Sequence, residues 1–139
     1  MKLKKENEIN KTNAVRTLIF LTIVSIIILL GFYFLLVSLH DILLSFIYLF
    51  FLFISALVFI FSIINSLESE NKMTFIQIAM VNVIAKIIGT VIILVSYIKF
   101  SGRVSKTSII PFIIIYLLFF VYETHFVYRL AKVKKIENE

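Results

Sequence analysis

The stretch VNVIAKIIGTVIIL, residues 81 to 94, places a single lysine, Lys86, inside an apolar run. The nearest other charged residues, Lys72 and Lys99, lie more than twelve positions away. An α-helix rises about 1.5 Å per residue, so about 20 residues cross a hydrocarbon core of about 30 Å. The run around Lys86 is long enough, and it predicts a transmembrane helix over residues 74–98.

Three further apolar runs of similar length surround this one, and SLHD at residues 38–41 is the polar break between the first two. Hydrophobic residues make up 61% of the chain, only three Gly and one Pro interrupt it, and the mean hydropathy is +1.07. The pattern predicts an all-α integral membrane protein with two helical hairpins. Asp41 is expected to cap the second helix. The predicted spans are 17–38, 42–65, 74–98 and 108–128.

The distribution of Lys and Arg predicts the orientation of these spans. Five precede the first span, one lies between the second and third, and four follow the last, whereas three lie between the third and fourth. The positive-inside rule then places both ends in the cytoplasm. We expect a basic cytoplasmic N-terminus (1–16), a transmembrane domain (17–131) and a charged cytoplasmic C-terminus (132–139). The first span is too long for a cleaved signal peptide.

Composition also argues against several classes of function. The net charge of +6 comes from residues at the ends of the spans, which favours contact with anionic lipid over nucleic acid. With no Cys, and with His40 and His125 in a turn and near a helix end, no catalytic or zinc-binding constellation is expected. Glu123 is the single carboxylate within a predicted span, so a metal site is not expected either. The sequence predicts no enzyme and no cofactor.

The polar residues within the third and fourth spans are the candidate functional site. Asn82 and Lys86 are four residues apart and therefore share a helix face. Ala85 and Gly89 form a small-xxx-small pair that would allow another helix to approach closely. A charge at mid-membrane costs about 2.5–3.5 kcal/mol on insertion scales, so Lys86 should face an acidic partner, protein or water.

Two partners for Lys86 stay open at this point. The first is Glu123 of the same chain, which could accept hydrogen bonds from both Lys86 and Asn82. Counted from the expected cytoplasmic ends of the spans, however, Lys86 lies about 18 Å deep and Glu123 about 8 Å. This difference favours a carboxylate on another membrane protein, although the lysine side chain can lean toward Glu123.

The second half of the chain resembles a known family. QIAMVNVIAKIIGTVIILVSYIKF (77–100), followed by SIIPFIIIYLLFFVYETHFVYRLAK (108–132), looks like the ATP synthase protein I family, small four-helix membrane proteins associated with bacterial F-type ATP synthases. Many members carry a lysine inside the third span and a proline opening the fourth, where this chain has Lys86 and Pro111. Some members have an acidic residue one turn before the lysine, where this chain has Asn82 and Val83.

The resemblance implies a protein of the bacterial cytoplasmic membrane that assists assembly of the synthase's ring of c subunits. The ion-binding carboxylate of the c subunit would then be a natural guest for Lys86. A role in Mg²⁺ transport is the rival function within the same resemblance. Apart from the resemblance, several copies of the chain could form a transporter or an oligomeric pore in which Glu123 and Lys86 line a polar path. The sequence alone leaves these functions open.

Overall fold

The structure is a computed structural model that describes residues 2–35, 39–67, 72–102 and 106–137. Within this part of the chain every residue except Gly102 is helical. Parts of the predicted connecting segments, among them Ser38, residues 68–71 and Arg103, lie outside it. The helices are α1 (Lys2–Leu35), α2 (Leu39–Leu67), α3 (Lys72–Ser101) and α4 (Lys106–Glu137).

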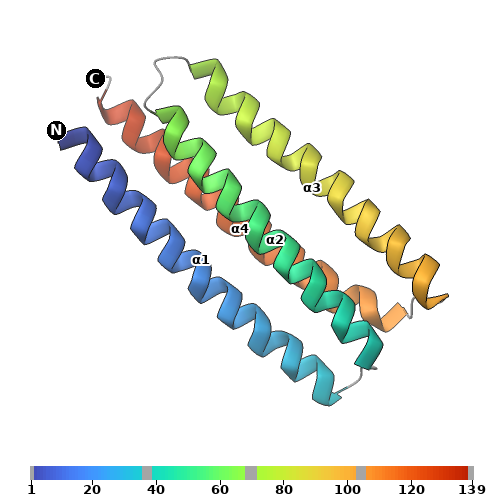
Figure 1. The fold of residues 1–139 in the computed structure, drawn as a ribbon. Coiled ribbons are helices and arrows are strands. Elements are labelled where there is room, and N and C mark those ends of the chain that lie inside the picture. The colour runs from blue at the N-terminus through green and yellow to red at the C-terminus, as the bar shows by residue number, and fades with distance from the viewer. Residues whose placement is uncertain (1, 36–38, 68–71, 103–105, 138–139) are drawn as a thin grey trace.

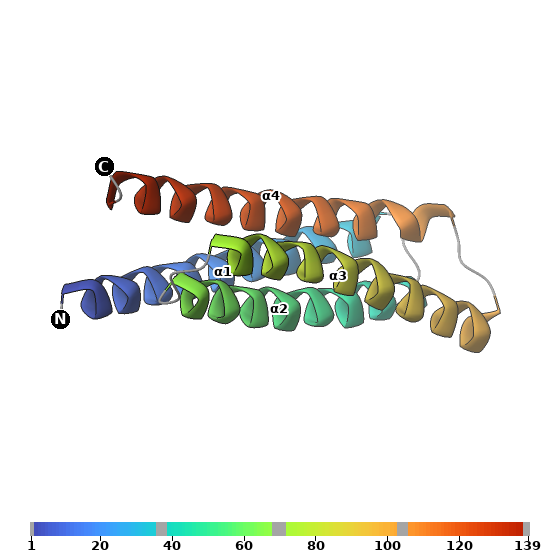
Figure 2. The ribbon, with the colours of Figure 1, turned by 90° about the horizontal axis from the view of Figure 1, so that it is seen from above.

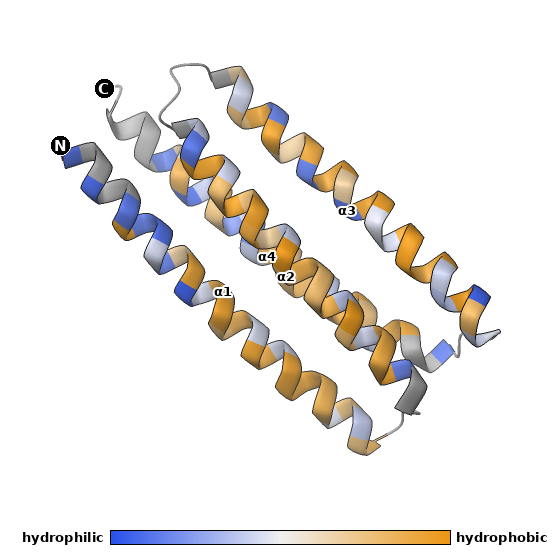
Figure 3. Ribbon diagram, viewed as in Figure 1, coloured by the Kyte–Doolittle hydropathy of each residue, from blue (hydrophilic) through white to orange (hydrophobic). Residues whose placement is uncertain are grey.

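Each of the four helices contains a segment long and apolar enough to cross a membrane. They run antiparallel in chain order, so the chain forms two helical hairpins, with the start of α1, the end of α2, the start of α3 and the end of α4 at the same end of the bundle (Figure 1). The apolar stretches fill the middle of the helices, and the N-terminal end of α1 is hydrophilic (Figure 3). The predicted fold, an all-α integral membrane protein with four transmembrane helices, is confirmed.

The outer helices are longer than the predicted spans. The N-terminal segment expected over residues 1–16 continues α1 back to Lys2, and α4 runs on to Glu137. These extensions are rich in Lys and Glu, which are good helix formers, and they contain no Gly or Pro. The extension of α1 packs on α2, since Lys11 Nζ lies 4.3 Å from the ring centroid of Phe61.

Different residues mark the start of α2 and the end of α3. Asp41 was expected at the N-cap of α2, and this is wrong, because α2 already begins at Leu39 and Asp41 lies in its first turn. A carboxylate there still interacts favourably with the helix dipole. At the other connection, Gly102 adopts φ +69° and its N–H donates to the Ile98 carbonyl at 2.9 Å. That left-handed glycine ends α3.

The packed core lies between α1, α2 and α4. α2 is the central helix and touches the other three, while α1 also touches α4. Ring stacking joins α2 to α4, where the centroids of Tyr48 and Phe112 are 3.7 Å apart, and the Tyr122 hydroxyl donates to the Ala14 carbonyl at 2.7 Å to join α4 to α1. Fully buried side chains of this core include Leu18, Leu29, Leu52, Ile60, Ile63, Ile115 and Phe119.

α3 stands apart from this core. It packs along α2, but within the described part of the chain no Cα atom of α3 lies within 8 Å of a Cα atom of α4 or α1. Figure 2 shows α3 alongside α2, with α4 running separately above them. The hydrogen bonds between α3 and α4 in this part of the chain are made by side chains.

Candidate functional site

Lys86 is the one buried side chain of α3 among residues 73–102. It is 5% exposed, and its ammonium group forms an ion pair with Oε1 of Glu123, which is 7% exposed. The pair therefore crosses the space between α3 and α4. Of the two partners that the sequence left open for Lys86, the carboxylate within the chain is the one found in the structure.

Asn82 completes the coordination of the carboxylate. It lies one turn before Lys86, and its Nδ2 donates to Oε2 of Glu123 at 3.0 Å. Ser55 of α2 in turn donates to Oδ1 of Asn82 at 3.4 Å. Each oxygen of Glu123 thus has a donor, and the polar network, defined as Ser55, Asn82, Lys86 and Glu123, joins α2, α3 and α4.

The predicted difference in depth does not prevent the ion pair from forming. The predicted depth of Glu123 was counted from Tyr128 as the end of the fourth helix, whereas α4 continues to Glu137. Because the counted end is not the true end of α4, the count does not fix the level of Glu123 relative to Lys86. A lysine side chain also reaches several ångströms and leans toward the N-terminus of its helix.

The small residues of α3 have different surroundings. Gly89 faces α2 of the same chain, because a Cβ built on it would lie 2.7 Å from Cε2 of Phe51. The close helix approach expected there thus occurs within the chain. Ala85 is exposed and lines a groove between α2 and α3 together with Ser55 and Asn82.

A cleft of about 430 Å³ lies between α3 and α4, and Asn82, Lys86 and Glu123 line it. Thr124, Tyr128 and Ala131, which also line the cleft, are exposed, so it is open to the surroundings of the protein. The remaining lining residues are mainly apolar or aromatic: Phe59, Ala79, Val83, Tyr116, Phe120 and Val127. The site is a mostly apolar cleft with one ion pair in its wall.

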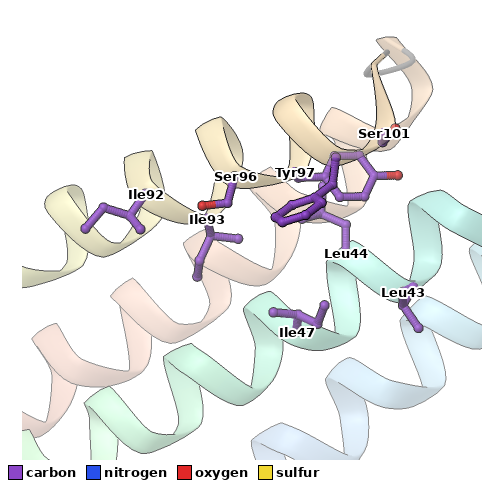
Figure 4. Close-up of a pocket in the computed structure, with 9 residues that line it drawn as sticks. Leu43, Leu44, Ile47, Ile92, Ile93, Ser96, Tyr97 and Ser101 are labelled. Atoms are coloured by element: carbon purple, nitrogen blue, oxygen red, sulfur yellow. The ribbon is translucent and has the colours of Figure 1, made fainter.

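Hydrogen bonds also join α2 to α3 toward the opposite end of the bundle. The hydroxyl groups of Tyr48 and Thr90 lie 3.1 Å apart, and the Tyr97 hydroxyl donates to Oδ1 of Asp41 at 3.4 Å. A groove of about 540 Å³ lies beside Tyr97. Figure 4 shows its side chains, which come from α2 and α3: Leu43, Leu44, Ile47, Ile92, Ile93, Ser96, Tyr97 and Ser101.

Sequence reasoning identified three of the four members of the polar network and missed Ser55. Three serines lie within the apolar part of α2, at 45, 55 and 62, and nothing in their spacing distinguishes the one that faces α3.

Among the described residues, no group of three or more His, Cys, Asp or Glu side chains could hold a metal ion. Comparison with protein-family models, curated proteins and solved structures finds no match.

Proposed function

We propose that this chain is a membrane assembly factor that receives a transmembrane segment of another protein, namely the c subunit of a bacterial F-type ATP synthase, during assembly of the c-ring. The c subunit is nominated by the resemblance of residues 74–131 to the ATP synthase protein I family. The proposed role is one of binding and release, without catalysis and without a cofactor.

The observation that carries the proposal is the position of Lys86. It is a buried cation on the helix that is least enclosed by the rest of the bundle, and it lines an open cleft. A buried ammonium group that lacks acceptors is costly, so a group with acceptor oxygens is favoured beside it. A guest helix that carries a carboxyl group within the membrane therefore matches this cleft better than a purely apolar helix does.

The distribution of charge supports a cytoplasmic location for both termini, in the bacterial cytoplasmic membrane. Ten Lys and Arg residues belong to the end that holds the termini and the α2–α3 connection, and three to the opposite end. Anionic lipid attracts such juxtamembrane cations. This orientation places the open rim of the cleft, at Tyr128 and Ala131, toward the cytoplasmic side.

Co-purification tests the proposal. The tagged full chain, expressed in cells that make the synthase, should retain the c subunit after extraction in mild detergent. Lys86→Met should reduce the retained c subunit, whereas Lys99→Met should not, because Lys99 is an exposed lysine of the same helix outside the cleft. Equal recovery of the c subunit with both variants would argue against the proposed role of Lys86.

The rival function is a small cation (Mg²⁺) transporter or an oligomeric pore. Purified chain in liposomes, without any partner, distinguishes the two. The assembly factor should conduct no ions and take up no Mg²⁺ above the level of empty liposomes. Uptake that depends on Lys86 or Glu123 would instead favour the transporter.

A further inference from the structure

Lys86 has more hydrogen-bond donors than the chain uses. An ammonium group carries three N–H donors and no acceptor. One donor is taken by Glu123, and Nζ makes no other hydrogen bond to the described residues. At 5% exposure the remaining donors have little access to solvent. Buried donors without acceptors are costly, so the site favours a ligand that supplies acceptor oxygens.

A second polar side chain, Tyr116, lines the same cleft, and its hydroxyl group has no hydrogen-bond partner among the described residues. Tyr116 is half-buried and stacks on Phe120, with ring centroids 6.2 Å apart. The cleft therefore offers donors on both of its walls, from Lys86 of α3 and from Tyr116 of α4.

The charge of the cleft is already balanced. Lys86 and Glu123 together carry no net charge, and both oxygens of Glu123 accept hydrogen bonds. A guest that entered as an ionised carboxylate would bring an excess negative charge into a low-dielectric site, which is strongly unfavourable. A guest that displaced Glu123 would leave that carboxylate buried without its cation. A neutral acceptor has neither cost.

We infer that the α3–α4 cleft binds the carboxyl group of a guest transmembrane helix in its neutral, protonated form, beside the Lys86–Glu123 ion pair and not in place of Glu123. This inference rests on the proposed function and specifies how the guest is recognised. The carbonyl oxygen of the guest carboxylic acid accepts from Lys86, and the guest group keeps its proton. A guest side-chain amide supplies the same acceptor and is therefore an equivalent ligand.

Synthetic guest helices test the inference. Three Leu/Ala transmembrane peptides of about 20 residues carry Glu, Gln or Leu at the central position. Binding to the full chain in lipid vesicles at neutral pH is measured by energy transfer between labelled peptide and protein. The Gln peptide should bind about tenfold more tightly than the Leu peptide, as expected for one or two interhelical hydrogen bonds. It should bind at least as tightly as the Glu peptide.

Two results would overturn the inference. If the Glu peptide bound more tightly than the Gln peptide, the cleft would prefer an anion, and the guest would displace Glu123. If the Gln peptide bound no better than the Leu peptide, the cleft would not recognise polar groups. Either result leaves the co-purification of the c subunit untouched, so failure of this inference is distinguishable from failure of the proposed function.

Glu123→Gln provides the matched variant. It preserves the size of the side chain and an acceptor for Lys86, but it removes the negative charge from the cleft. The preference should then reverse, because an ionised Glu guest would supply the missing counter-charge, and the Glu peptide should bind more tightly than the Gln peptide. An unchanged preference in a folded Glu123→Gln chain would contradict the account of charge balance.

Discussion

Lys86 of α3 and Glu123 of α4 form a buried ion pair between two helices that have no Cα atoms within 8 Å of each other in the described part of the chain. The pair and its neighbour Asn82 supply the hydrogen bonds between these helices. α3 is otherwise attached through α2. The position of α3 relative to α4 thus depends on polar side chains, which also form the proposed binding site.

Removing either member of the pair should destabilise the protein. Lys86→Met leaves Glu123 buried without its cation, and Glu123→Leu leaves Lys86 without its anion. We expect each to lower the free energy of unfolding by about 1–3 kcal/mol, between the values for buried ion pairs in soluble proteins and for polar contacts in membranes. Unfolding in mixed detergent micelles, followed by circular dichroism, measures the change.

The double variant Lys86→Met/Glu123→Leu separates the pair from its individual members. Its loss in the free energy of unfolding should be smaller than the sum of the losses in the two single variants, because neither charge is then left buried without its partner. The charge swap Lys86→Glu/Glu123→Lys should likewise recover part of the stability lost in each single swap. Strict additivity in both cycles would show that the two side chains do not interact.

Asn82 should contribute less than the ion pair. Asn82→Leu removes the donor to Oε2 of Glu123 and the acceptor of Ser55, with an expected loss of about 1 kcal/mol. Asn82→Asp has nearly the same shape but places a carboxylate beside Glu123, so it should be the more destabilising of the two. The reverse order, from the same unfolding measurement, would be inconsistent with Asn82 donating to Glu123.

A side chain at Gly89 would require the ring of Phe51 to move, because a Cβ there would overlap the outer atoms of that ring. Gly89→Ala is expected to weaken the packing of α3 on α2 and to lower the thermal midpoint of unfolding, and Phe51→Leu should partly restore it. Gly31→Ala is the control. A Cβ at Gly31 meets nothing within 4 Å, so this change should be neutral or stabilising by up to about 1 kcal/mol through helix propensity.

The fold was predictable because charged residues are segregated from the apolar runs, and a membrane-spanning run of this length has few alternatives to a helix. The extensions of α1 and α4 were not predicted, because hydropathy marks where a helix crosses the membrane and not where it ends. For the fourth span, hydropathy falls after Tyr128, although α4 continues to Glu137.

The candidate site was predictable in its members and less so in its geometry. Lys86, Asn82 and Glu123 are conspicuous because polar residues are rare in the spans. Whether they meet depends on the register and tilt of α3 against α4, which no local pattern encodes. Ser55 and Phe51 were missed because α2 is apolar around most of its circumference, so its sequence does not mark the face that meets α3.

The orientation prediction can be tested by cysteine labelling, since the chain has no Cys of its own. Single cysteines at Thr12 and Lys132 should react with a membrane-impermeant maleimide only from the cytoplasmic side. A cysteine at Lys99 should react only from the opposite side. All three positions are exposed. Labelling of all three positions from one side would contradict the four-span topology.

The most direct test of the central claim, that Lys86 in the α3–α4 cleft receives the c subunit, is assembly of the c-ring in cells whose only copy of this protein carries Lys86→Ala. Blue native electrophoresis of solubilised membranes measures the assembled ring, with Lys99→Ala as the matched control and immunoblotting to establish equal protein levels. The account predicts a strongly reduced amount of assembled c-ring with Lys86→Ala and a normal amount with Lys99→Ala. Unimpaired assembly with Lys86→Ala would contradict it.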